Sequence, residues 1–233
     1  MHYSNPYIEL CLEANSSVFK GLSPKDKELI DQHHSYATFK KGQLIIKDGD
    51  KARGLIFLVS GKVKIFKVGV GGREQILKMV RQNGIIGYRT LISESTHTVS
   101  AEAVEDSTVC IIEKGVLARL LKKNADLSYR LMKIITEELV FLSNRTVSLT
   151  QKHIRGRVAE SLLVLRDTYG MEADGKTIRI SLSREDIANL SNMTTSNAIR
   201  TLSNLASEGV IGMEGRRIRI LDMKNLDRIS ELG

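Results

Sequence analysis

Cysteine, proline and tryptophan are scarce in this chain. Its 233 residues include 2 cysteines, 2 prolines and no tryptophan. Two thiols are too few for a disulfide framework or for an iron–sulfur cluster held by four cysteines. A reducing cytoplasm is therefore the expected location. Cys110 lies in an apolar run, which favours a buried small apolar residue, whereas Cys11 is a candidate exposed thiol.

Long apolar runs are also absent. No stretch approaches the roughly 20 apolar residues that a membrane helix needs. The first ten residues, MHYSNPYIEL, contain no apolar core of a secretory signal. We therefore expect no membrane partner. A hydrophobic content of 42 % is ample for packed cores and excludes a disordered or collagen-like chain.

Positive charge exceeds negative charge overall. Lys and Arg number 35 against 27 Asp and Glu, which gives a formal net charge of +8. Such a balance favours polyanionic partners. Residues 152–233 carry 13 basic and 11 acidic side chains, a net +2, so most of the excess lies earlier in the chain.

The first half of the chain has the pattern of short strands. A helix is expected from Ser23 to Ser35, with Ser23 as its N-cap and Pro24 at its first position. From Phe39 to Ile112, short apolar or alternating runs are separated by glycine-containing turns, which is typical of an antiparallel sandwich or barrel. The glycine-rich stretch 69–72 is followed by an extended run, so we interpret it as a hairpin tip and not as a phosphate loop.

A long helix is expected from Asp126 to about Leu149. Its apolar residues form two stripes: Leu127, Leu131, Ile135, Leu139 and Leu142, and then Ile134 and Phe141. Apolar residues on more than one face imply packing against the helix's own domain and against something else. A second copy of the same helix is the economical candidate. A hinge is expected at 150–156, around Gly156.

The last eighty residues have the pattern of a helix-turn-helix followed by a wing. We expect a helix through residues 158–165, a short strand from Thr177 to Ser181, helices over 183–190 and 194–207, a hairpin over 210–221 and a final helix over 223–232. Ser183 and Thr194 can cap the two middle helices. Ala188 suits a close helix crossing, and Asn192 suits a left-handed turn.

One face of the second helix in this pair carries polar groups that can reach DNA bases. Its N-terminal end presents the residues Thr194, Thr195, Ser196, Asn197 and Arg200. Hydroxyl, amide and guanidinium groups at that end of a recognition helix can bind base edges in the major groove. Arg216, Arg217 and Arg219 on the hairpin are suited to phosphates. The alternative is an ordinary amphipathic surface helix.

Several motifs resemble the Crp/Fnr family of bacterial transcription regulators. In the first half they are Phe39-x-Lys41-Gly42-Gln43-x-Ile45, Gly49-Asp50 and Leu58-x-Ser60-Gly61-x-Val63-Lys64. In the second half they are Gly156-Arg157-Val158-Ala159-x-x-Leu162-Leu163, Leu182-Ser183-Arg184-Glu185-Asp186-Ile187-Ala188 and Gly215-Arg216-Arg217-Ile218-x-Ile220-Leu221. The resemblance covers nearly the whole chain in order. It implies base contacts at Thr195, Ser196 and Arg200, with Asn197 nearer the backbone. Most relatives have an acidic residue in place of Ser196, so the operator should differ.

The resemblance also locates an effector pocket and shows departures in it. Members that bind cyclic nucleotides use a Gly-Glu pair for the ribose and an Arg-Ser or Arg-Thr pair for the phosphate. The matching stretches here are Gly87-Tyr88-Arg89 and His97-Thr98, so Tyr88 replaces the Glu and His97 the Arg. The hydroxyl pair that relatives use for the base is Leu142-Ser143 here. A neutral imidazole lacks the charge of a bidentate cation, and cyclic nucleotide binding in the usual mode is not expected.

Three alternatives remain open at this pocket. Arg89 could supply the missing charge to a different anion beside His97, or Arg89 is solvated and His97 caps a strand. Tyr88 could fill the space of the ligand, which would leave a sensor without a small molecule. Haem-binding relatives use His or Cys near this pocket, which leaves that role open for His97.

The sequence favours DNA binding over an enzymatic function. Metal-dependent cupin enzymes need two histidines separated by one residue, a pattern that the five histidines do not form. No nucleophile elbow appears either. We therefore expect no enzyme activity, no metal and no cofactor. The second-ranked function is a β-roll and winged-helix module for protein interaction or small-ligand sensing without DNA binding.

The sequence predicts an α+β protein with three parts. Residues 1–125 should form an antiparallel β-roll sensor domain, residues 126–152 a long dimerisation helix, and residues 153–233 a winged helix-turn-helix domain. The expected partners are a near-palindromic DNA operator, a second copy of the chain, RNA polymerase and an effector whose identity the sequence leaves open.

Overall fold

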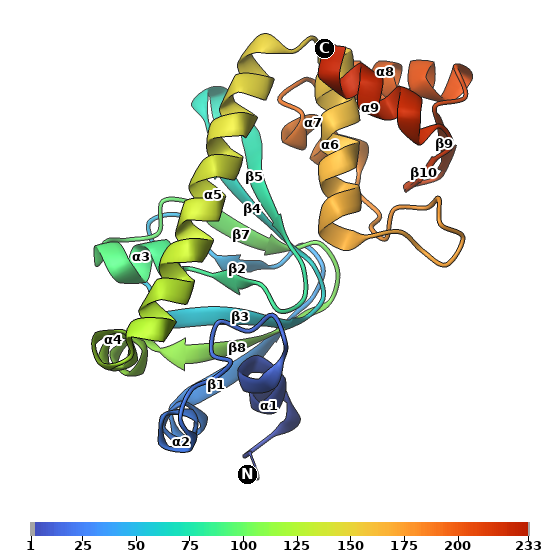
Figure 1. Ribbon diagram of the computed structural model, residues 1–233. Coiled ribbons are helices and arrows are strands. Elements are labelled where there is room, and N and C mark those ends of the chain that lie inside the picture. Colours follow the sequence, from blue (N-terminus) through green and yellow to red (C-terminus); the bar gives the residue numbers. More distant parts are fainter. Residues whose placement is uncertain (1–2, 233) are drawn as a thin grey trace. The chain divides into compact units, whose positions relative to one another are not determined.

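The computed structural model describes residues 3–232 (Figure 1). The chain forms two compact units, Met1–Lys67 with Lys78–Leu139, and Val68–Leu77 with Val140–Gly233. The long helix α5 (Ala125–Gln151) contributes to both units, so this division differs from the three parts expected from the sequence, which stay a prediction. Among the described residues, no helix is long and apolar enough to cross a membrane.

Two antiparallel four-stranded sheets confirm the predicted β-roll. One sheet has the order β1-β8-β3-β6 and the other β2-β7-β4-β5. The strands are β1 (His34–Phe39), β2 (Leu44–Ile46), β3 (Gly54–Ser60), β4 (Val63–Val68), β5 (Glu74–Val80), β6 (Ile85–Ile86), β7 (Ser100–Ala103) and β8 (Ser107–Glu113). The glycine-rich stretch 69–72 joins β4 to β5, as expected for a hairpin tip, and includes the short 3-10 turn η1 (Val70–Gly72).

Strand β3 is buried on both faces, which explains why its sequence is continuously apolar. Leu55 and Phe57 face one core, in which helices pack on the sheet. Ile56 and Leu58 face a second core, which also takes residues from β2, β4 and β7 of the other sheet. Side chains alternate along a strand, so a strand between two cores needs apolar residues at every position.

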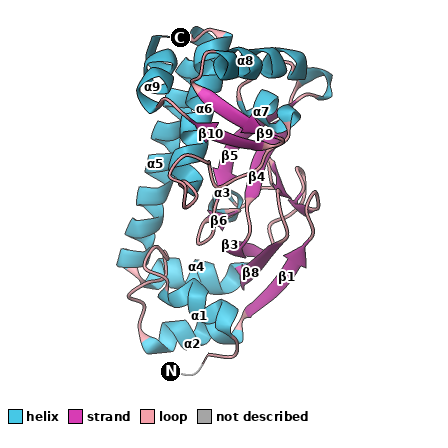
Figure 2. Cartoon of the chain, turned by 90° about the vertical axis from the view of Figure 1, so that its right-hand side faces the viewer, coloured by secondary structure: helices cyan, strands magenta, loops and turns pink. Residues whose placement is uncertain are grey.

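Helices α1 (Pro6–Glu13) and α4 (Lys114–Lys123) contact β3 and β8 (Figures 1 and 2). Helix α2 (Pro24–Gln32) packs against α4. The cap of α2 is confirmed, because the Ser23 side chain accepts from the backbone N–H of Asp26. This helix ends at Gln32, earlier than expected. Sequence reasoning missed α1, although Asn5 caps it and Pro6 follows at its first position.

Cys11 is fully buried, so its expected exposure is wrong. It lies on the inner face of α1 with Ile8 and Leu12, and all three side chains are 0 % exposed. Cys110 of β8 is buried in the same core, as expected. The fold thus places both thiols of the chain in one apolar core. Burial and a hydrogen bond with Cys110 raise the pKa of the Cys11 thiol.

The second unit contains the predicted helix-turn-helix, wing and final helix. Its elements after α5 are α6 (Ile154–Tyr169), α7 (Arg184–Leu190), α8 (Thr195–Ser207), β9 (Ile211–Glu214), β10 (Arg217–Ile220) and α9 (Met223–Leu232). The strand expected from Thr177 to Ser181 is wrong, because this stretch forms only isolated bridges. Its backbone N–H groups divide between two partners, because Ile178 donates to the carbonyl of Ile218 in β10 and Arg179 donates to the carbonyl of Gly170, so no continuous ladder forms.

The break between α5 and α6 falls within the range 150–156 in which a hinge is expected, although Gly156 itself lies inside α6. Helix α5 ends at Gln151 and α6 begins at Ile154, so the helical path breaks at residues 152–153. His153 has the extended dihedral angles φ −63° and ψ 160°. Gly156 is buried in the first turn of α6.

The burial of both thiols generates a testable prediction. In the folded protein neither Cys11 nor Cys110 should react with Ellman's reagent, because a thiol in an apolar core is not accessible to the reagent. In denaturant, two thiols per chain should react. Rapid reaction of either thiol without denaturant would contradict the burial of α1 on the sheet.

Candidate nucleic-acid interface and sensor pocket

Two capped helices form the centre of the candidate nucleic-acid interface. At the start of α7, Ser183 Oγ accepts from the backbone N–H of Asp186 at 2.9 Å, and the Asp186 carboxylate accepts from the backbone N–H of Ser183 at 3.3 Å. At the start of α8, Thr194 Oγ1 accepts from the backbone N–H of Asn197 at 3.3 Å. These bonds satisfy amides that would otherwise lack partners, so each helix begins at a fixed residue.

The turn between α7 and α8 has the predicted geometry. Asn192 has a φ of +50°, in the left-handed region that asparagine tolerates. Its carbonyl accepts from Arg157 Nη1 at 2.9 Å. Ala188 is 1 % exposed, consistent with the close helix crossing for which a small side chain was expected.

The predicted recognition residues are brought together on the outer face of α8. Thr194, Thr195, Ser196 and Arg200 are exposed, whereas the opposite face of α8 is buried through Ala198, Leu202 and Leu205. Asn197 is half-buried, and its Oδ1 accepts from Arg200 Nη2 at 2.7 Å. This bond orients the guanidinium.

Sequence reasoning missed Ile199, which lies on the same side of α8. Its side chain is 47 % exposed. The signal was available in the sequence, because an isoleucine one residue after the buried Ala198 lies outside the inward positions 198, 202 and 205.

The three arginines of the wing lie in different environments. Strands β9 and β10 pair so that Arg217 is opposite Glu214, which leaves a two-residue turn of Gly215 and Arg216. Arg216 is exposed at this turn. Arg217 forms an ion pair with Glu172, and Arg219 Nε lies 3.9 Å from Asp174. Of the three, Arg216 has no ion pair within residues 3–232 and is the most available to a phosphate.

A buried arginine supports the helix pair from behind. Arg145, in the C-terminal part of α5, is 4 % exposed. Its Nη2 donates to Ser161 Oγ at 3.0 Å and to the carbonyl of Leu190, the last residue of α7. Glu160 lies 3.9 Å from its Nη1. Burial lowers the pKa of Arg145, and the charge of Glu160 opposes this shift.

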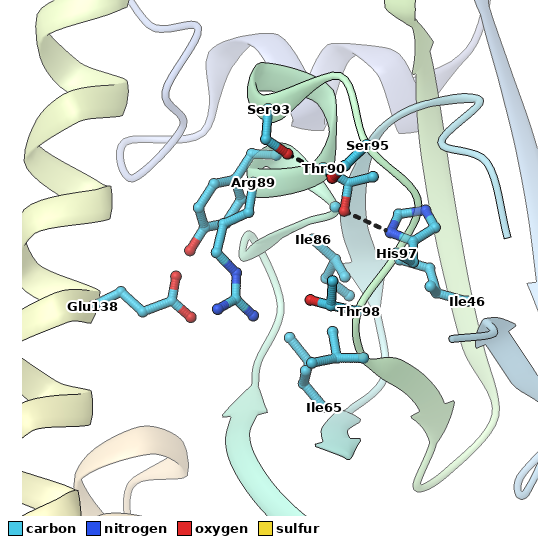
Figure 3. A pocket seen from close by; sticks show the side chains of 13 residues that line it. Ile46, Ile65, Ile86, Arg89, Thr90, Ser93, Ser95, His97, Thr98 and Glu138 are labelled. Carbon is cyan, nitrogen blue, oxygen red and sulfur yellow. Dashed lines mark hydrogen bonds between the residues drawn. The ribbon is translucent and has the colours of Figure 1, made fainter. Parts of the chain in front are cut away.

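The sensor pocket lies in the first unit and gathers most of its predicted residues. Gly87 precedes the short helix α3 (Tyr88–Ser93), which sequence reasoning did not identify as a helix. A cavity of about 110 Å³ is lined by Gly87, Tyr88, Arg89, His97 and Thr98, together with Ile46, Ile65, Ile86, Thr90, Ser93, Ser95, Val99 and Glu138 (Figure 3).

The predicted pair Leu142 and Ser143 does not line this cavity. Both residues follow Leu139, where the first unit ends, and α5 contributes Glu138 to the lining instead. A role for Leu142 and Ser143 stays a prediction.

His97 is a buried, hydrogen-bonded part of the pocket wall. It is 6 % exposed, and its Nδ1 lies 3.0 Å from Thr90 Oγ1 (Figure 3). Burial lowers the pKa of His97, while the charge of Asp50 opposes the shift. The imidazole is therefore neutral at pH 7 and supplies no charge for a phosphate.

Glu138 is the charged pocket residue that sequence reasoning missed. Its side chain is 7 % exposed, and its Oε1 lies 3.4 Å from Lys78 Nζ. Its Oε2 and the hydroxyl of Tyr88 are buried without a hydrogen-bond partner in the described chain. The signal was positional, because Glu138 follows Leu131 by seven residues and so continues the buried stripe of α5.

Arg89 completes the polar lining. It is exposed at its position on α3 and has no ion pair or hydrogen bond among residues 3–232. In Figure 3 its guanidinium points toward the space between Glu138 and Thr98. No group of three or more His, Cys, Asp or Glu in the described residues is placed to hold a metal ion.

Comparisons with known proteins match both units. Residues 36–124 match the cyclic nucleotide-binding domain, and residues 156–229 match the Crp-like helix-turn-helix domain. A CRP-like cAMP-activated global transcriptional regulator of Mycobacterium tuberculosis is 24 % identical over 217 residues, which cover 92 % of this chain and 96 % of that protein. An anaerobic regulatory protein of Bacillus subtilis is 27 % identical over 189 residues, covering 80 % and 79 %.

Solved structures show the same fold. The structure of FixK2 from Bradyrhizobium japonicum superposes with a TM-score of 0.76 at 23 % identity, covering 84 % of this chain and 96 % of that one. At this identity the match supports the fold.

The burial of His97 predicts how stability depends on pH. Its folded-state pKa is below its usual value near 6.5, so the unfolded chain takes up the proton first as pH falls. The free energy of unfolding should therefore decrease from pH 7 toward pH 5, by at most about 1.4 kcal/mol per pH unit from this group. A His97→Gln variant should show a flatter dependence in urea titrations. His153→Gln, at an exposed histidine, is the control; identical profiles for wild type and His97→Gln would contradict the assignment.

Arg145 predicts a large stability effect from a single side chain. Arg145→Met keeps most of the side-chain length but removes both donated hydrogen bonds. Losing charged hydrogen bonds should lower the free energy of unfolding by about 1.5–3 kcal/mol. Arg228→Met, at an exposed position of α9, should stay within about 0.5 kcal/mol of wild type. Urea denaturation followed by circular dichroism measures both, and equal stability of the two variants would refute the supporting role.

Proposed function

This chain belongs to the Crp/Fnr family of DNA-binding transcription regulators. We propose that it binds a near-palindromic operator as a homodimer and that it does not bind cyclic AMP in the family's usual mode. The observation that carries the proposal is the recognition face of α8, where exposed polar groups stand on a helix whose other face is buried. We place the protein in the cytoplasm, with RNA polymerase as a further partner, and assign it no catalysed reaction.

The recognition face supplies groups for base and backbone contacts. Arg200 can donate two bonds to O6 and N7 of a guanine, while Thr195 and Ser196 carry hydroxyls that suit several bases. Thr194 and Asn197 lie at the helix start, where phosphate contacts fix the register of a protein on DNA. Arg216 at the wing turn suits a neighbouring phosphate, and Arg217 would have to leave Glu172 to do the same.

An exposed apolar stripe on α5 supports the homodimer. Tyr129, Met132, Leu139, Val140 and Val147 are between 53 % and 67 % exposed. The spacings from Tyr129 to Met132 and from Met132 to Leu139 are three and seven, which keeps them on one seam of a coiled coil. A second copy of α5 would cover this stripe in a two-fold dimer. Two recognition helices would then enter successive major grooves about 34–36 Å apart.

The pocket chemistry argues against cyclic AMP in the usual mode. The cavity of about 110 Å³ is below the roughly 300–1,000 Å³ of pockets that bind drug-sized ligands. Tyr88 is 3 % exposed where relatives have a glutamate, and His97 is neutral where they have an arginine. The carboxylate of Glu138 adds a negative charge to the lining, which disfavours an anion near it. The positive charge of Arg89 is compatible with a different small effector.

Selection of bound sequences from random duplex DNA tests the proposal. The purified protein without added ligand should enrich a palindrome. Arg200→Ala should lose preference at one base pair in each half-site, at a cost of about 1–3 kcal/mol, because it removes a bidentate guanine contact. Arg228→Ala loses the same charge on α9 and should keep the wild-type preference.

Two outcomes would contradict the proposal. If Arg200→Ala recovers the same palindrome with equal stringency, the base contact assigned to Arg200 is wrong. If wild type enriches nothing, either alone or with a small-molecule extract of bacteria, DNA binding by this chain is refuted.

A further inference from the structure

Ile199 is the one large apolar side chain exposed on α8. It is the fifth residue of the helix and is 47 % exposed. Single exposed isoleucines are ordinary on protein surfaces. The position of this one is what distinguishes it, because Thr195 and Ser196 precede it by four and three residues and Ser203 follows it by four. Residues at these spacings lie side by side on a helix, so Ile199 is surrounded by the polar groups of the recognition face.

The rest of this face lacks the groups that read cytosine. Its side chains are hydroxyls, the half-buried amide of Asn197 and the guanidinium of Arg200, and no carboxylate is present on α8. A carboxylate is the side chain that accepts from the cytosine amino group. Thymine differs from the other bases by a methyl group that projects into the major groove, where apolar side chains contact it.

We infer that Ile199 reads the methyl group of a thymine in each half-site. This inference rests on the proposed DNA-binding function and specifies one base of the operator. Contact with the methyl group would remove apolar surface of Ile199 from water, and a polar side chain at this position would gain nothing from the same methyl group.

The position of the thymine follows from the neighbouring arginine. Arg200 is the next residue, and its guanidinium is held by Asn197 Oδ1 at 2.7 Å. Adjacent helical residues differ by 1.5 Å along the axis and by about 100° around it. Base pairs are spaced 3.4 Å apart. The two side chains therefore reach different but nearby bases, and the thymine should lie within about two base pairs of the guanine bound by Arg200.

Replacement of single thymines by deoxyuridine tests this inference, because it removes the methyl group and keeps the base pair. The thymines of the selected palindrome are replaced one position at a time, and each replacement is made at the same position of both half-sites. Affinity is measured for wild type, Ile199→Ala and the control Leu232→Ala, which loses an exposed leucine on α9. Circular dichroism verifies that each variant is folded.

The expected result is a methyl effect that depends on Ile199. Burying one methyl group is worth a factor of about four in affinity, so removing it from both half-sites should weaken wild-type binding about fifteenfold. Leu232→Ala should show the same loss, and Ile199→Ala should show less than a twofold loss at that position. In a parallel selection, Ile199→Ala should accept other bases there.

Other outcomes distinguish failure of this inference from failure of the proposed function. If no thymine methyl group affects wild-type binding, or if the effect is equal in Ile199→Ala, the role of Ile199 is refuted while DNA binding stands. If the selection yields no palindrome for wild type, both fail.

Discussion

The second unit depends on a guanidinium that has almost no access to water. Arg145 donates to the carbonyl of Leu190 at the C-terminal end of α7, where helix carbonyls lack intrahelical partners and carry partial negative charge. It also donates to Ser161 of α6. A buried cation that loses its partners is costly, so these bonds hold α7 and α6 to the C-terminal part of α5. The turn at Asn192 and the caps of α8 then fix the direction in which the recognition residues point.

The same buried stripe of α5 carries a second charged residue, and this makes the helix difficult to interpret from hydrophobicity. Leu127 and Leu131 are buried in the apolar core of the first unit. Seven residues after Leu131 comes Glu138 in the pocket wall, and seven residues later comes Arg145. Residues seven apart return to nearly the same face of a helix. The buried stripe therefore continues along one face of the helix while its side chains change from apolar to charged. The large apolar residues of another face of α5 are exposed.

Local signals explain which parts of the fold could be predicted. The helix-turn-helix was predictable because its determinants are close in sequence: Ser183 and Asp186 bond each other, Thr194 bonds Asn197, and Asn192 takes the left-handed turn. The strand expected at Thr177–Ser181 was wrong because the backbone of this stretch divides its hydrogen bonds between Ile218 and Gly170. Cys11 was misjudged because its burial depends on β8, about a hundred residues later. Glu138 was missed because a pocket wall is assembled by tertiary contacts and not by adjacent residues.

The pocket and the recognition face differ from the family pattern in the same way, because neutral side chains occupy positions where relatives carry charged ones. In the pocket, Tyr88 and His97 are neutral where relatives carry a carboxylate and a guanidinium, and the charged groups come instead from Glu138 and Arg89. On α8, Ser196 is neutral where most relatives are acidic, and Ile199 adds an apolar surface. The backbone of both sites is set by caps, turns and buried apolar residues that do not touch a ligand. Side chains that face a ligand or a base can therefore change their charge without cost to the fold, and architecture is transmitted within the family more faithfully than the identity of the effector or the operator.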